Sequence, residues 1–84
     1  MRLVDIKNVF VICKIWTWGD ASTTFLRFKE NDILFIKKIV YINKYDRCEI
    51  LVLDVNLIPY IIQMTYVDHK SFEKRFKERF DVLV

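Results

Sequence analysis

The side chains best suited to covalent chemistry in this sequence are its one histidine and a few hydroxyl and thiol groups. His69 would have to activate a nucleophile such as Ser71, Cys13 or Cys48. That chemistry needs the base within hydrogen-bond reach of the nucleophile and a carboxylate that orients the base. Ser71 lies two residues from His69 at the start of an expected helix, where side chains two positions apart diverge. We therefore expect no catalytic site and interpret His69 as a solvated residue of the first helical turn.

Metal and cofactor chemistry is equally weakly indicated. Cys13 and Cys48 are far apart in the chain and form no CxxC pair, and a zinc site needs more cysteines or nearby histidines. Neither a GxGxxG nor a GxxxxGK sequence is present to hold a phosphate. Asp46 and Asp54 flank a strand and are interpreted as turn residues. We expect no metal, no cofactor and two buried free thiols.

Two tryptophans are the residues that best indicate binding. Trp16 ends a predicted strand, and Trp18 begins the stretch WGDAS, in which Gly19, Asp20 and Ser22 disfavour regular structure. We predict a surface loop over Thr17–Thr24, and such loops often carry binding residues. The predicted partner-binding residues are Trp16, Trp18 and Asp20, because tryptophan brings a large rigid contact area. The alternative is that Trp18 folds back and plugs the end of a barrel.

A second candidate surface combines cations with aromatic rings. Aromatic residues interleaved with cations on strands stack bases and neutralise phosphates. Edge-strand lysines that block pairing between sheets would look the same in sequence. The candidate nucleic-acid-binding residues are Lys37, Lys38, Tyr41, Lys44, Tyr45 and Arg47.

The elements that position these residues are mainly strands. Isoleucine, valine and phenylalanine dominate, alanine occurs once, and this composition favours pleated, half-buried structure. Five strands are predicted, at residues 9–16, 25–28, 33–42, 48–54 and 59–66. Turns are expected at Lys29–Asp32, Asn43–Arg47 and Val55–Ile58, with a bend or bulge at Lys37–Lys38.

The periodicity changes after residue 67. Asp68 is the expected N-cap of a helix over residues 69–80, in which Phe72, Phe76 and Phe80 recur every four residues along one face. A last short strand is expected over residues 82–84. The pattern predicts a mainly β protein with one C-terminal helix: a five-stranded antiparallel barrel or a strongly bent sheet.

Composition limits the remaining possibilities. The chain has 84 residues, 54% of them hydrophobic, which fits one folded domain over residues 1–84 and not a disordered tail. The longest apolar run is five residues, Val9–Cys13, so no membrane span or secretory signal is expected and we predict a cytoplasmic protein. A domain this small buries only part of its apolar surface, which leaves some for a partner or a second copy. The net charge of +3 is only a weak indication of nucleic acid.

The segments FKENDILFIKKIV, CEILVLDVN and YIIQMTYVDHKSFEKRF resemble small SH3-like barrels of phages and mobile elements. In those proteins a turn with Gly or Asn before Asp opens a strand, and a final F-x-x-x-F segment covers one end. Asn31 and Asp32 stand at the turn here, and the resemblance spans residues 28–76. It implies a fold and a source, and it assigns no functional residue.

Together these observations predict a non-catalytic protein-binding module, an inhibitor of a host factor encoded by a phage or mobile element. An anti-CRISPR or other counter-defence protein is one example of that class. The alternative is a small nucleic-acid-binding β-barrel, and a third possibility is a homo-oligomer that covers its own apolar surface.

Overall fold

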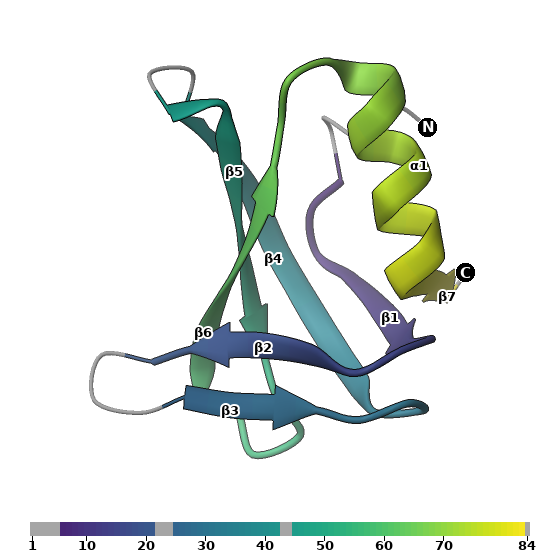
Figure 1. Cartoon of the computed structure of the whole chain (residues 1–84). Helices are drawn as coiled ribbons and strands as arrows, with labels where there is room; N and C mark the ends of the chain where they lie inside the picture. Colours follow the sequence, from purple (N-terminus) through teal and green to yellow (C-terminus); the bar gives the residue numbers. More distant parts are fainter. Residues whose placement is uncertain (1–5, 22–24, 43–44, 84) are drawn as a thin grey trace.

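The computed structural model describes residues 6–21, 25–42 and 45–83. Within them, seven strands form one antiparallel sheet, and a single helix follows the sixth strand (Figure 1). The elements are β1 (Val9–Cys13), β2 (Thr17–Asp20), β3 (Phe25–Phe28), β4 (Ile33–Ile42), β5 (Arg47–Leu53), β6 (Pro59–Thr65), α1 (His69–Arg79) and β7 (Phe80–Leu83). The prediction of a mainly β chain with one C-terminal helix is confirmed, but the prediction of five strands is wrong.

Short connections force the sheet to curl. The strand order is β3-β2-β6-β5-β4-β1-β7, so β1 and β2 are four positions apart. In a flat sheet they would be separated by about 19 Å at roughly 4.8 Å per strand. Residues 14–16 alone connect Cys13 to Thr17, and that stretch spans at most about 14 Å. The sheet therefore bends until its two flanks approach each other, which produces the curled half-barrel in Figure 1.

A second corner lies beside the first. Lys29–Asp32 joins β3 to β4, which are also four positions apart. The two corners are tied together, because the Cys13 N–H donates to the Asp32 carbonyl at 2.9 Å and the Asn31 N–H donates to the Cys13 carbonyl at 2.8 Å. The predicted turn at Lys29–Asp32 is confirmed. The predicted strand over residues 9–16 instead ends at Cys13, and the chain turns the corner before it enters β2.

The bulge predicted at Lys37–Lys38 is present. The pairing of β4 with β5 shifts register between Ile36 and Lys38. Before the shift, Leu34 and Ile36 are buried in the core, whereas after it Ile39 packs against the core. Lys37 and Lys38 are consequently both exposed, because the extra residue changes which alternate positions face inward.

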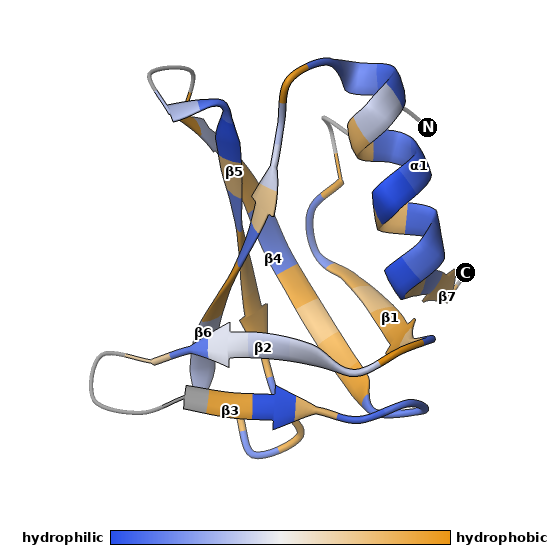
Figure 2. Cartoon of the chain, in the orientation of Figure 1, coloured by the Kyte–Doolittle hydropathy of each residue, from blue (hydrophilic) through white to orange (hydrophobic). Residues whose placement is uncertain are grey.

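Helix α1 covers the inner face of the sheet through its aromatic stripe. Phe72, Phe76 and Phe80 are fully buried, with ring centroids 6.0 Å apart for the first pair and 5.2 Å for the second. Figure 2 shows the rest of the helix as hydrophilic. The prediction of one stripe packed against the sheet is confirmed, with Phe80 opening β7 rather than ending the helix. Within the described residues, no helix is both long and apolar enough to cross a membrane.

The start of α1 gives a pH-dependent prediction. Asp68 caps the helix, and its pKa lies below the usual 3.8 because the Ser71 backbone N–H and then the Ser71 hydroxyl donate to the carboxylate. A lowered pKa in the folded state means that this contribution to stability is complete above the pKa of the unfolded chain and is lost as the pH falls through the folded-state pKa. Asp68→Ala should therefore lower the melting temperature at neutral pH. The difference in melting temperature between the variant and wild type should become smaller below about pH 3.8, where the carboxylate begins to be protonated. Lys70→Ala, a change at an exposed residue of the same helix turn, is the control. A difference in melting temperature that does not change with pH would show that the charge of Asp68 does not stabilise the helix.

Candidate binding surfaces

The groups considered first for covalent chemistry are held in structural roles. The Ser71 hydroxyl donates to the Asp68 carboxylate at 3.1 Å, and His69 Nε2 lies 3.5 Å from Glu73 Oε2 on the next turn. Ser71 thus serves the helix cap. Among the described residues, no group of three or more His, Cys, Asp and Glu side chains is placed to hold a metal ion.

Both cysteines are free and buried in the core, on β1 and β5. Burial first, and then the nearby charge of Asp32, together raise the pKa of the Cys13 thiol to about 11. Burial also raises the pKa of Cys48 to about 11, with a hydrogen bond to the Met64 backbone opposing and the charge of Glu49 adding to the rise. At neutral pH both thiols are protonated, and a protonated thiol is a poor nucleophile and metal ligand.

Trp16 and Trp18 lie on a strand and its entry, not on a loop. The prediction of a loop over Thr17–Thr24 is wrong for Thr17–Asp20, which form β2, whereas residues 22–24 lie outside the described part of the chain. Thr17 and Gly19 point inward and are buried. The strand forms despite its glycine because Gly19 leaves room for the Phe28 ring, a packing requirement that local composition does not reveal.

The alternation of β2 places the three predicted partner-binding residues on one outer face. Trp16 and Trp18 are 54% and 53% exposed, and their rings meet edge to face with centroids 5.9 Å apart. Asp20 is half-buried at the end of the strand, where it pairs with Ile61 of β6. The Arg27 guanidinium lies 5.9 Å from the centre of the Trp16 ring, and Arg27 pairs with Trp18 across β2 and β3. We call Trp16, Trp18 and Arg27 the tryptophan surface.

The surroundings of the tryptophan surface carry charges of both signs. A shallow hollow of about 470 Å³ beside Trp16 is lined in part by Lys14, Lys29 and Glu30. Lys14 is directed toward the end of α1, since its Nζ donates to the Lys77 carbonyl at 3.0 Å and lies 3.9 Å from the Asp81 carboxylate. An approaching molecule therefore meets Arg27 and Lys29 together with Glu30 and, at the end of β2, Asp20.

The predicted nucleic-acid-binding residues are distributed over two faces of the sheet. Lys37 and Lys38 are exposed at the bulge. Tyr41 packs half-buried on the inner side, with its ring centroid 4.7 Å from that of Tyr66 and 6.1 Å from that of Phe72. At the far end of the hairpin, the Arg47 guanidinium lies 5.2 Å from the centre of the exposed Tyr45 ring. Lys44 lies outside the described residues.

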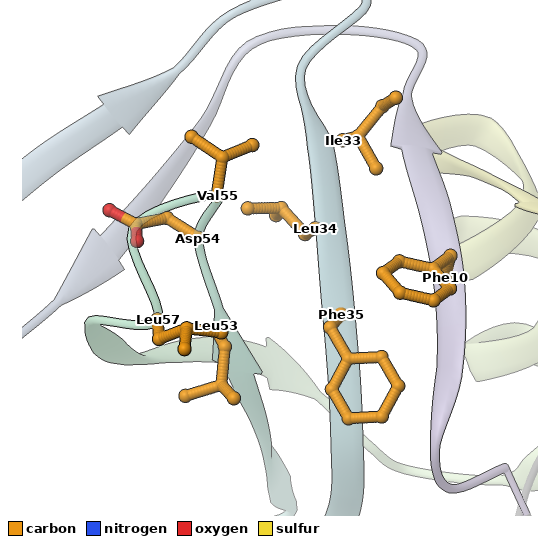
Figure 3. A pocket seen from close by; sticks show the side chains of 8 residues that line it. All are labelled: Phe10, Ile33, Leu34, Phe35, Leu53, Asp54, Val55 and Leu57. Atoms are coloured by element: carbon orange, nitrogen blue, oxygen red, sulfur yellow. The ribbon is translucent and has the colours of Figure 1, made fainter.

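A second exposed apolar area lies on the outer face of β7, β1, β4, β5 and β6. Register places one apolar residue from each strand in a single row across this face: Leu83, Phe10, Phe35, Leu53 and Pro59. Phe10 is 54% exposed, and its ring centroid lies 5.0 Å from that of Phe35. A pocket of about 310 Å³ opens on this row, with Phe10, Ile33 and Phe35 on one side of β4 and the residues that follow β5 on the other (Figure 3).

A tight turn forms the far rim of this pocket. Asp54 holds the turn, because its Oδ1 accepts the Asn56 N–H at 2.8 Å and the Ile58 N–H at 3.0 Å. Val55 and Leu57 are 79% and 74% exposed, and Leu57 has a φ of 63°, a left-handed conformation that glycine or asparagine usually occupies. Residues held in such conformations cluster at functional sites. We call this area, from the five-strand row to the turn, the outer apolar face.

Sequence reasoning found the tryptophans but missed Arg27 and the outer apolar face. The signal for the face was present: Phe10 and Ile12 make the second side of β1 apolar, and the turn Val55–Ile58 carries three branched apolar residues where polar ones are usual. Assembling these residues into one surface required the strand order, which places β1 beside β4.

Comparison with profiles of known protein families found no match, and searches of curated proteins and of solved structures found none either.

Proposed function

We propose that this protein is a non-catalytic protein-binding module whose contact surface is the tryptophan surface. The observation that carries the proposal is the pair of half-exposed tryptophans held against each other on a strand. Binding energy concentrates in a few large residues, chiefly Trp, Tyr and Arg, at the centre of an interface. Trp16, Trp18 and Arg27 supply that combination on a backbone fixed by pairing with β3.

The groups around the tryptophans indicate the chemistry of the partner. The two rings are flanked by Arg27 and Lys29 and by the acids Glu30 and Asp20, so the complementary surface carries an apolar group with charged groups of both signs around it. The class we propose is a cytoplasmic inhibitor of a host factor, of the kind that phages and mobile elements encode, with anti-CRISPR proteins as one example. Small size and the resemblance to SH3-like phage barrels support this class.

Replacing Trp18 by alanine tests the proposal. Loss of a central tryptophan costs about 2 kcal/mol or more of binding free energy, so affinity for the captured protein should fall at least about thirtyfold. The melting temperature should change little, because Trp18 is half-exposed. A plug residue would give the reverse: a lower melting temperature with unchanged affinity of the folded fraction. The measurement is affinity capture from a lysate, followed by titration of the purified partner.

The matched control is Tyr45→Ala, which removes an exposed aromatic ring at the other end of the sheet. Protein binding through the tryptophan surface predicts unchanged affinity for this variant. The nucleic-acid alternative predicts that Tyr45→Ala and the double change Lys37→Glu, Lys38→Glu weaken binding, that nuclease removes the signal, and that salt weakens it steeply. Capture that survives Trp18→Ala and resists both nuclease and salt would contradict both functions.

A further inference from the structure

We propose that the outer apolar face packs against the same face of a second copy of this chain, forming a two-fold symmetric dimer. The proposal goes beyond the binding function, because this face is formed by β7, β1, β4, β5, β6 and the turn after β5, whereas the tryptophans lie on β2 and its entry.

The exposed area matches what a stable dimer needs. Five of the large apolar side chains on the face are each between 40% and 79% exposed: Phe10, Ile33, Val55, Leu57 and Leu83. At roughly 70–130 Å² apiece they present about 500 Å², and the exposed Pro59 and the half-buried Phe35 and Leu53 between them add to this area. The face therefore lies at the upper end of the range of about 300–600 Å² for the largest apolar patch on a typical monomer. A standard interface buries about 800 Å² on each partner, a size that this face reaches together with a polar rim.

The rim of the pocket offers a contact surface to a second copy. Val55 and Leu57 line the 310 Å³ pocket and are 79% and 74% exposed, so the pocket has an apolar rim that is open to solvent (Figure 3). A two-fold axis near this rim would bring the Val55 and Leu57 side chains of each copy against the pocket of the other. Contacts of this kind need one self-complementary patch and no second surface.

Charge gives no reason for a different partner at this face. Among the described residues that line the pocket, Asp54 alone carries a charge, and its Oδ1 accepts hydrogen bonds from the backbone N–H groups of Asn56 and Ile58. Because the Asp54 carboxylate is hydrogen-bonded within its own turn, two copies of this apolar face do not repel each other. The face also has no excess of positive or negative charge that would favour an acidic or a basic protein. The left-handed Leu57 fits the same interpretation, since an apolar side chain is retained there at the expense of an unfavourable backbone conformation.

The mass in solution tests this proposal directly. Sedimentation equilibrium of the whole chain over a roughly hundredfold dilution series should show twice the 10.3 kDa mass of the chain at the upper end, dissociating on dilution. Leu57→Asn is the decisive variant, because asparagine tolerates the left-handed conformation and removes only the apolar contact. It should weaken self-association about thirtyfold or more and leave the far-ultraviolet circular dichroism unchanged. Phe10→Glu should do the same from the other rim of the pocket.

Two controls make the result specific. Val67→Asn removes an exposed apolar side chain between β6 and α1 and should leave the dimer intact. The double change Trp16→Ala, Trp18→Ala should also stay dimeric, so failure of the proposed function and failure of this proposal are separable. A wild type that is monomeric at every concentration would overturn the dimer. So would a dimer that persists in both Leu57→Asn and Phe10→Glu. A monomer that loses capture of another protein only when Phe10 is changed would assign the face to that protein instead.

Discussion

Replacing Phe76 by alanine should lower the free energy of unfolding by about 3–5 kcal/mol, a large share of the stability of so small a domain. Phe76 is fully buried, and its ring lies between those of Phe72 and Phe80, with centroids 6.0 Å and 5.2 Å away. Phe72 in turn contacts Tyr66, which directly follows β6, with ring centroids 5.4 Å apart. Removing the middle ring leaves a cavity where the helix meets the sheet, and the surrounding rings belong to α1, β7 and the segment after β6, whose positions are fixed by other contacts.

The measurement is urea unfolding, with the slope against denaturant checked for two-state behaviour. Lys74→Ala is the matched control on the same helix, because Lys74 is exposed and the change preserves helix propensity. In a domain of this size, a loss of 3–5 kcal/mol lowers the melting temperature by more than about 12 °C. A Phe76→Ala protein that melts within about 3 °C of wild type would show that α1 does not depend on this contact.

Replacing Gly19 by alanine should also change the stability strongly, and whether the variant is more or less stable than wild type is informative. Gly19 lies in the interior of β2 with no positive φ, so strand propensity alone predicts that alanine stabilises the protein by about 0.5–1 kcal/mol. Packing predicts the opposite. A Cβ on Gly19 would overlap the Phe28 ring and approach the Tyr60 Cβ to 3.3 Å. We expect Gly19→Ala to destabilise by about 1–3 kcal/mol and Gly19→Val to destabilise more.

A double-mutant cycle identifies the cause. Phe28 and Tyr60 are both buried, with rings edge to face at 5.3 Å, so the overlap has little room to relax. Phe28→Leu replaces the neighbouring ring by a smaller side chain. It should lower the free energy of unfolding less in the Gly19→Ala protein than in wild type, which gives a favourable coupling energy between the two positions. A neutral or stabilising Gly19→Ala would mean that the corner between β1 and β2 opens easily and does not hold the curl of the sheet.

The sequence predicts well where local pattern and tertiary position agree. Tyr60, Ile62 and Met64 alternate inward on β6, and Cys48, Ile50 and Val52 do so on β5, as the period of two indicates. The helix and its Asp68 cap are also found from spacing alone. Both predictions are reliable because the side-chain pattern and the backbone preferences favour the same kind of element.

Prediction fails where a long-range contact decides the conformation. Gly19 and Asp20 favour a loop locally, yet they form a strand because Thr17 and Gly19 face the core and β3 pairs alongside. The corner after Cys13 has no local signal, because Ile15 and Trp16 continue the strand-favouring composition beyond Lys14. The outer apolar face depends on the pairing of β1 with β4 and β7, which no local pattern specifies.

The strand order also has a consequence for the order in which the chain folds. β4, β5 and β6 are consecutive in sequence, adjacent in the sheet and joined by short turns, so their pairing closes only short loops. β1 must meet β7 across most of the chain, and β2 must meet β6 across almost half of it, and such contacts form late because their loop-closure entropy is larger. We expect the three-stranded meander to be structured in the folding transition state and both flanks to attach afterwards. Core substitutions in β5 would then slow folding, whereas substitutions in β2 or β7 would mainly speed unfolding.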